Sequence, residues 1–285
     1  MLYLVLAIAS SALISILMRF SEKHIKTEMG MFMANYAVCV LLSFLFMNKD
    51  VDYFAKTSLA PMLGFGVISG VLYLVSFLFL KFNMKHNGIV MASTFMKLGV
   101  LIPTLMAIVI FGEKPRTTQV LGIVLSLAAI VLLHFEKEGI QSEKTSGQTS
   151  KKVWLLLLLL LSGITDSMAN IYEKMGSASV KDGYLLITFV TAFLLTIFFI
   201  VMQKQNVTRQ DILFGLLIGI PNYFSARFLL LALGEVAAVL VYPMYSVATM
   251  ITITMAGVFI FKETIGKKKV FALGLIVVAL CLLNM

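Results

Sequence analysis

The stretch Phe111-Gly112-Glu113, followed by an apolar run at residues 120–133, is nearly repeated 150 residues later in this chain. The second copy is Phe261-Lys262-Glu263, followed by an apolar run at residues 270–283. Internal repetition in a strongly apolar chain is typical of membrane carriers, which hold their substrate near the bilayer midplane between the two halves. The sequence therefore indicates a doubled, membrane-embedded unit.

Composition supports this interpretation. Hydrophobic residues make up 60% of the 285 residues, charged residues 13%, and the mean hydropathy is +0.99. A soluble domain carries about 25% charged and about 45–50% apolar residues, and one membrane-spanning helix needs about 20 mostly apolar residues. The predicted fold class is an all-α membrane protein with ten transmembrane helices, at residues 2–19, 29–47, 58–80, 88–111, 117–134, 152–172, 184–202, 210–232, 236–261 and 268–284.

The longest gap between these spans is a polar segment at residues 135–151, rich in Lys, Glu, Ser, Thr, Gly and Gln. This composition is that of a flexible linker. It divides the chain into a first five-helix repeat at residues 1–134 and a second at 152–285. The remaining loops are too short to hold a soluble catalytic domain. The net charge of +9 is spread over them rather than clustered, so no nucleic-acid partner is expected.

Lysine and arginine positions predict the orientation. The loops after the first, third, fifth, seventh and ninth spans carry fifteen of these residues, and the opposite side carries six. Because cytoplasmic loops are enriched in Lys and Arg, we expect these loops in the cytoplasm and both termini outside a plasma (cytoplasmic) membrane. With five spans in each half, the two repeats are predicted to be inverted.

Two cysteines, Cys39 and Cys281, fall inside apolar spans and are interpreted as core packing. The chain has neither a CxxC metal motif nor the G-x-x-x-x-G-K-[ST] nucleotide-binding motif. We therefore expect no cofactor, no metal and no ATP hydrolysis by the chain itself.

The ten-span plan, with each half closing on an aromatic-x-Glu turn and a Gly/Ala/Leu-rich helix, resembles the drug/metabolite transporter superfamily in its bacterial ten-helix (EamA-like) branch. The resemblance covers essentially the whole chain. It implies a carrier that alternates access around a central cavity lined mainly by helices 1, 3, 4, 6, 8 and 9. Many members of the superfamily are described with both termini inside, which conflicts with the orientation given by the charges.

Three charged residues lie well inside predicted spans: Lys97, Asp166 and Arg227. A charged side chain near the bilayer centre costs about 2.5–3.5 kcal/mol on insertion scales, so such residues usually face a cavity or the protein interior. Their spans are three of those that the resemblance places around the cavity. We interpret Lys97 and Arg227 as binding groups for an anion, with Asp166, taken as buried, as their counter-charge or as a proton carrier.

Two polar stripes accompany these charges, each with a four-residue spacing that keeps side chains on one helix face. We predict that the stripes line the cavity, with Ser15, Arg19 and Asn170 among the substrate-binding residues. The simpler interpretation is that the serines pack helices and the terminal cations reach the interface; we prefer it for Lys23 and Lys174. The stripes consist of Ser11, Ser15, Arg19 and Lys23 on the first span, and Ser162, Asp166, Asn170 and Lys174 on the sixth.

Further polar residues are predicted to line the cavity. Aromatic packing is an equal alternative for the tyrosines, of which Tyr73 and Tyr223 correspond under the repeat. Glu113 and Glu263 are interpreted as structural charges at helix ends, where capping explains a carboxylate. The cavity candidates are Ser93 beside Lys97, Asn222 and Tyr223 beside Arg227, Tyr73 on the third span, and Tyr242 and Tyr245 on the ninth.

The function predicted from these residues is secondary transport of a small polar metabolite, an amino acid, organic acid or phosphorylated compound, by alternating access. A cationic cavity favours a carboxylate or phosphate. The chain is not expected to be an enzyme, because Asp166 is the one carboxylate near the middle of a predicted span. A flippase for a lipid-linked or anionic-headgroup substrate on the same fold is the alternative. The lipid bilayer is the expected environment, and a monomer and a homodimer both remain open.

Overall fold

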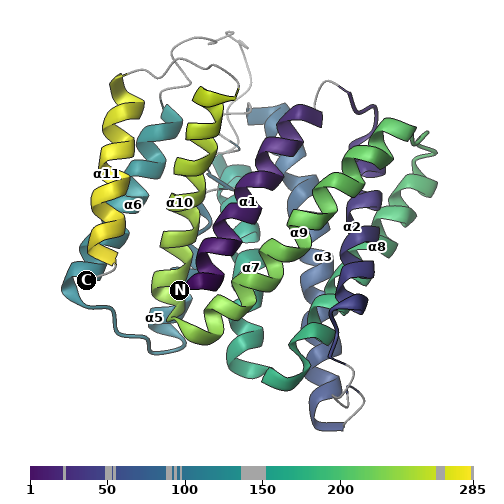
Figure 1. Ribbon diagram of the computed structural model, residues 1–285, viewed down its shortest axis with the longest axis horizontal. Helices are drawn as coiled ribbons and strands as arrows, with labels where there is room; N and C mark the ends of the chain where they lie inside the picture. The colour runs from purple at the N-terminus through teal and green to yellow at the C-terminus, as the bar shows by residue number, and fades with distance from the viewer. Residues whose placement is uncertain are drawn as a thin grey trace. The chain divides into compact units, whose positions relative to one another are not determined.

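The computed structural model of this protein describes residues 1–21, 24–48, 53, 56–87, 92, 95–96, 98–135, 152–260 and 267–283. These residues form helices and connecting turns, without a β-strand (Figure 1). The helices are α1 (Leu2–Ser21), α2 (Glu28–Leu45), α3 (Lys56–Asn87), α5 (Leu101–Val109), α6 (Thr117–Phe135), α7 (Lys152–Met175), α8 (Lys181–Met202), α9 (Arg209–Glu235), α10 (Ala238–Phe259) and α11 (Lys267–Leu283), with a 3₁₀ turn, η2, at Ala178–Val180.

Among the described residues, seven helices are long and apolar enough to cross a membrane, as expected for an all-α membrane protein. They are α1, α2, α3, α7, α8, α9 and α10. Shorter apolar helices, α6 and α11, match two further predicted spans. The predicted span at 88–111 lies partly outside the described residues, and α5 covers its end. The count of ten and the inverted relation of the halves stay predictions.

The chain divides into two compact units. The first consists of Met1–Leu74 and Met168–Glu235, and the second of Val75–Ser167 and Val236–Met285. Each unit therefore contains residues from both predicted repeats. The predicted linker at 135–151 lies outside the described residues apart from Phe135, which ends α6.

In the first unit, α9 packs between α1 and α2, and α2 also packs on α8 (Figure 1). The α2–α9 contact is close because Gly215 and Gly219 lie four residues apart on α9. A Cβ at Gly219 would lie 2.7 Å from the Asn35 carbonyl oxygen. One at Gly215 would lie 2.6 Å from Ala34 Cβ. This is the small-xxx-small packing that lets membrane helices approach at backbone distance.

The beginning of α9 is tied to the connection between α1 and α2 by Asp211, which is fully buried. Its carboxylate accepts hydrogen bonds from the backbone N–H groups of Lys26 (2.7 Å), Thr27 (3.2 Å) and Thr208 (2.8 Å), and from Thr27 Oγ1 (2.8 Å). Thr208 Oγ1 in turn accepts from the Asp211 N–H at 3.3 Å. A buried carboxylate is tolerable here because its lone pairs are satisfied.

In the second unit, α10 packs against α5, α6 and α11, and α6 packs along α11 (Figure 1). Glu113 stands after α5, and its Oε2 accepts a hydrogen bond from the Val239 N–H at 2.9 Å, in the first turn of α10. The interpretation of Glu113 as a capping carboxylate is therefore confirmed, although the helix it caps is distant in sequence. Glu263 lies outside the described residues.

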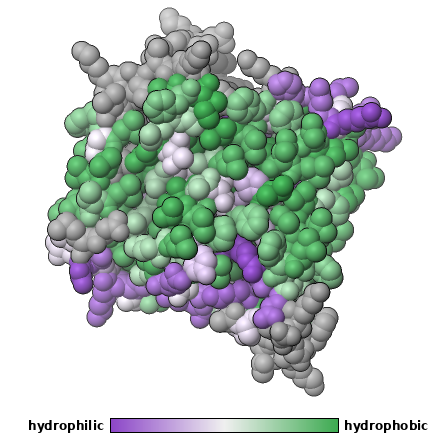
Figure 2. Space-filling view, viewed as in Figure 1, coloured by the Kyte–Doolittle hydropathy of each residue, from purple (hydrophilic) through white to green (hydrophobic). Residues whose placement is uncertain are grey.

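Large apolar side chains are exposed along the helices, as expected where lipid is the solvent. Figure 2 shows apolar residues dominating the face in view, with hydrophilic residues gathered at its margins. Phe198, Phe259 and Val109 are 59%, 75% and 78% exposed. Cys281 is also exposed, so its interpretation as core packing is wrong, whereas Cys39 is buried as predicted. A free cysteine behaves as a small apolar side chain, so it can lie in the protein interior or face lipid.

Candidate functional site

Arg227, on α9, is held by three groups of the first unit. Its Nη1 lies 3.0 Å from Asp182 Oδ1, donates to the Phe46 carbonyl oxygen at 3.3 Å, and donates to the Tyr223 hydroxyl oxygen. The guanidinium carbon also lies 5.6 Å from the Phe46 ring centroid and 5.9 Å from that of Tyr223, within cation–π range. The cation is thus fixed by one carboxylate and two aromatic rings.

Local sequence explains each of these contacts. Tyr223 and Arg227 are four residues apart on one helix, so their side chains share a face. Phe46 is the C-cap of α2, where the last carbonyls lack an intrahelical partner and accept outside donors. Asp182 lies in the first turn of α8, where the helix dipole favours a negative charge.

Asp182 is a site residue that the sequence analysis missed. The predicted span began at residue 184, which placed Asp182 in a loop. In the structure α8 begins at Lys181, and the Asp182 side chain is only 19% exposed, against 22% for Arg227. An acidic residue just before an apolar run is a helix-start signal, and this signal could have extended the helix to include it.

A tyrosine cluster continues from Asp182 along the ends of α7 and α8. The rings of Tyr172 and Tyr184 stack with centroids 4.0 Å apart and an interplanar angle of 10°. The Tyr184 hydroxyl is 2.9 Å from Ser69 Oγ on α3. In the connection between α2 and α3, burial raises the pKa of the Tyr53 phenol, and the nearby Asp182 carboxylate raises it further.

A second ion pair joins the same two helix ends, where Lys181 Nζ lies 2.6 Å from Glu173 Oε2. Both side chains are less than one-fifth exposed. Gly234 of α9 packs against this ion pair, since an added Cβ at Gly234 would lie 3.1 Å from both Lys181 Nζ and Glu173 Oε1. The end of α7, the beginning of α8 and the last third of α9 thus form one polar cluster, defined by Arg227, Asp182, Tyr223, Tyr172, Tyr184, Glu173 and Lys181.

Asn170 lies one turn before Glu173 on α7 and is 1% exposed. Neither its Oδ1 nor its Nδ2 has a hydrogen-bond partner among the groups that surround it. Leaving a buried polar group unpaired costs about 1–3 kcal/mol, and most native proteins avoid it. An amide kept at this cost is a ligand-binding candidate, as the stripe on the sixth span predicted.

Other predicted residues of the first unit make contacts within the protein. Asn222 Nδ2 donates to Asn35 Oδ1 at 3.2 Å and lies 3.6 Å from Cys39 Sγ, which joins α9 to α2. Ser15 Oγ donates to the Ser11 carbonyl at 3.2 Å. Arg19 is exposed and Tyr73 half-buried. The structure joins Asn222 to α2, leaves the Ser15 hydroxyl bonded within its own helix, and brings Arg227 together with Tyr223.

In the second unit, Tyr242 is 2% exposed and donates its hydroxyl to the Asp166 backbone carbonyl at 2.7 Å, which joins α10 to α7. Tyr245 is half-buried. Asp166 is exposed, so its interpretation as a buried charge is wrong. Lys97 and Ser93 lie outside the described residues.

Within the first unit, the carboxylate that pairs with Arg227 is Asp182. Within the described ranges, no group of three or more His, Cys, Asp or Glu side chains could hold a metal ion. The arrangement can bind charge and hydrogen-bond partners through Arg227, Asn170 and the tyrosine hydroxyls.

Comparison with known proteins gives a family and a fold. Residues 1–135 match the model of the EamA-like transporter family. A Haemophilus influenzae protein described as uncharacterized is 24% identical over 277 residues, covering 93% of this chain and 91% of that protein. A protein known from a crystal structure superposes with a TM-score of 0.78 at 15% identity, covering 99% of this chain and 94% of its own. The predicted resemblance to the drug/metabolite transporter superfamily is confirmed over residues 1–135, and this chain shares the fold of the crystal structure over nearly its whole length.

Proposed function

We propose, from the match of residues 1–135 to the EamA-like transporter family, that this multi-pass membrane transporter moves a small polar metabolite carrying a carboxylate or phosphate. Transport occurs by alternating access between the two five-helix repeats and is not driven by ATP hydrolysis in this chain. Arg227 binds the anionic part of the substrate, and Lys97 supplies the second cation.

The observation that supports this proposal is the way Arg227 is held. A guanidinium group has five N–H donors in a fixed planar fork, and the contacts described above all use Nη1. Donors therefore remain for a planar anion, which arginine binds through two parallel hydrogen bonds. A cation positioned by two aromatic rings is also preorganised, so little freedom is lost when the anion binds.

Asp182 keeps Arg227 paired when no substrate is bound. A partly buried cation without a partner would carry a large desolvation cost. A substrate anion then joins or replaces the Asp182 carboxylate, and the second cation offsets the added negative charge. With Asp182 paired to Arg227, Asp166 either balances the charge of Lys97 or carries a coupled proton.

Asn170 supplies the second determinant. Its carboxamide offers one acceptor and two donors, and it lies on the same helix as Glu173, within the first unit. A substrate with hydroxyl, amino or amide groups would satisfy it, whereas a purely apolar anion would leave it unpaired. Amino acids, hydroxy acids and sugar phosphates are therefore the favoured classes.

Thermal-shift measurements on the purified protein test the proposal. The panel contains amino acids, organic acids, sugar phosphates and phospholipid headgroup esters, the last group covering the flippase alternative. A ligand at 100 times its dissociation constant stabilises the protein by about 2.7 kcal/mol. Uptake of a labelled hit into vesicles then follows.

Arg227→Gln should lose both the thermal shift and uptake while remaining folded. Arg209→Gln is the matched control, because Arg209 is an exposed arginine at the start of the same helix. Full binding and transport by Arg227→Gln would show that Arg227 is structural, and the proposed site would have to be abandoned.

A further inference from the structure

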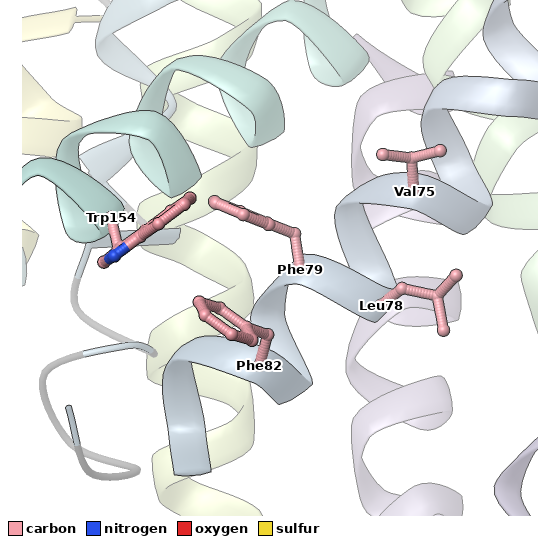
Figure 3. A pocket seen from close by; sticks show the side chains of 5 residues that line it. All are labelled: Val75, Leu78, Phe79, Phe82 and Trp154. Atoms are coloured by element: carbon pink, nitrogen blue, oxygen red, sulfur yellow. The ribbon is translucent and has the colours of Figure 1, made fainter. Parts of the chain in front are cut away.

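An apolar groove of about 310 Å³ lies on the second unit, between the last turns of α3 and the first turn of α7. It is lined by Val75, Leu78, Phe79, Phe82 and Trp154. Figure 3 shows Trp154 of α7 facing Phe79 and Phe82 of α3. The groove volume is at the lower end of the range for ligand sites, about 300–1,000 Å³. A polar metabolite would find almost no hydrogen-bonding groups here.

Ring–ring contacts hold the aromatic side chains on one side of the groove. Phe82 meets Trp154 edge-on at 5.3 Å between centroids and stacks on Phe79 at 5.8 Å. The imidazole of His86 packs on Phe82 at 4.2 Å. Its Nδ1 lies 2.8 Å from the Phe82 carbonyl oxygen, which can only accept, so Nδ1 donates. Val75 and Phe82 are 40% and 37% exposed, which leaves the groove open to the hydrocarbon around the helices.

The groove sits at helix ends that carry positive charge in the sequence. α3 ends at Asn87 and α7 begins at Lys152, so Trp154 is two residues from its helix start, at the depth where tryptophan marks the membrane interface. The sequence has Lys81, Lys85 and Lys152 on these two ends, and Lys151 just before α7. The orientation predicted above places them on the cytoplasmic side, where anionic lipids gather near basic residues.

We propose that this groove binds one anionic phospholipid of the surrounding bilayer. One acyl chain lies against Phe79, Phe82 and Trp154, and the phosphate interacts with the basic ends of α3 and α7. The apolar lining selects a hydrocarbon chain, and the charge selects the headgroup. Each basic residue near an anionic headgroup strengthens binding about fivefold. The site shares no residue with the Arg227 cluster and does not depend on what the protein transports.

Trp154 provides a direct measurement, because it is the single tryptophan of the chain. The full-length protein is reconstituted into phosphatidylcholine vesicles containing increasing fractions of phosphatidylglycerol or phosphatidylcholine with brominated acyl chains, which quench tryptophan on contact. We expect brominated phosphatidylglycerol to reach half-maximal quenching at a mole fraction at least about fivefold lower than brominated phosphatidylcholine does. Added NaCl should reduce this preference by screening and leave quenching by phosphatidylcholine unchanged.

A variant with Lys81, Lys85 and Lys152 replaced by glutamine should lose the preference and keep the same maximal quenching. The control replaces Lys26, Lys204 and Lys267, which lie on other predicted cytoplasmic loops, and has the same net charge. Equal quenching curves for the two lipids in the unmodified protein would show ordinary boundary lipid and overturn the proposal. A preference that survives the first triple variant would overturn the headgroup assignment. The comparison in the unmodified protein is decisive even where a variant folds poorly.

Discussion

Arg227 Nη1 and Asp182 Oδ1 lie 3.0 Å apart and join the last third of α9 to the first turn of α8. Both side chains are about one-fifth exposed, so water screens the pair only in part. The ion pair and a bound anion therefore depend on the same guanidinium group.

Asp182→Asn should lower stability and tighten anion binding. The variant leaves Arg227 without its carboxylate, at a cost of about 1–3 kcal/mol. A substrate anion would then restore the missing charge. Thermal unfolding in detergent, with and without a hit from the ligand panel, measures both effects. Unchanged stability together with unchanged affinity would mean that the ion pair is unrelated to the site.

Asp166→Asn should separate binding from coupling. If Asp166 carries the proton, ligand-induced thermal shifts persist, because Arg227 keeps Asp182 as its partner. Uptake driven by a pH gradient is then lost, since asparagine cannot exchange a proton. Vesicle uptake with and without the gradient gives the result. Gradient-driven uptake equal to that of the unmodified protein would remove Asp166 from the mechanism.

Asn170→Leu should abolish transport without destabilising the protein. Both polar atoms of this side chain are buried and unpaired, so an apolar residue of similar size relieves a cost of about 1–3 kcal/mol for each group. Asn222→Leu is the control, because its amide bonds Asn35 across α2 and α9 and its loss should reduce stability. A large loss of stability in Asn170→Leu would point to an unseen structural partner such as ordered water.

Gly219→Ala should destabilise the first unit by about 1–3 kcal/mol, the usual cost of overpacking. The added methyl would lie 2.6 Å from Val38 Cβ and 2.7 Å from the Asn35 carbonyl, and one of the two helices would have to shift. Gly64→Ala is the matched control, because nothing lies within 4 Å of its Cβ position in α3. That change should stabilise by about 0.5–1 kcal/mol. Thermal unfolding of the pair shows whether the signs differ as expected.

Asp211→Asn should lower the free energy of unfolding more than Thr27→Val does. The carboxylate accepts from three backbone N–H groups and one hydroxyl, and an asparagine NH₂ would face donors in place of an acceptor. Hydrogen bonds to charged groups contribute about 1.5–3 kcal/mol, and a neutral one about 1 kcal/mol. Chemical or thermal unfolding of both variants gives the order. Equal losses of stability in the two variants would show that the hydrogen bond from the Thr27 hydroxyl contributes most of the stabilisation.

The positions of most helices follow from apolar runs alone, because a bilayer requires them. The shared face of Tyr223 and Arg227 likewise follows from four-residue spacing. The partner of Arg227 does not, because Asp182 is brought to it by the packing of α8 and α9 on α2, which leaves no local pattern in the sequence. Asp166 shows the same limit: its spacing on α7 was clear, but whether the carboxylate is covered depends on neighbouring helices.

α3 shows where composition misleads. The apolar run stops near residue 80, and the predicted span stopped with it, yet the helix continues through Lys81 to Asn87. Lysine and methionine are good helix formers, and a helix does not have to end at the membrane surface. The residues added by this extension include Phe82, which lines the apolar groove, and His86, whose imidazole packs on the Phe82 ring.

The division of each compact unit between distant parts of the chain has a consequence for biosynthesis. When the ribosome has made α1 and α2, the α2 surface that meets Gly215 and Gly219 has no partner, and none arrives until α9 is inserted. The second unit is completed last, because the backbone of Val239, which Glu113 binds, and α11, which packs on α6, are made after α9. Membrane insertion of the early helices must therefore precede their tertiary assembly, and half-made chains expose the asparagine-bearing face of α2 to the lipid and to any chaperone in the membrane.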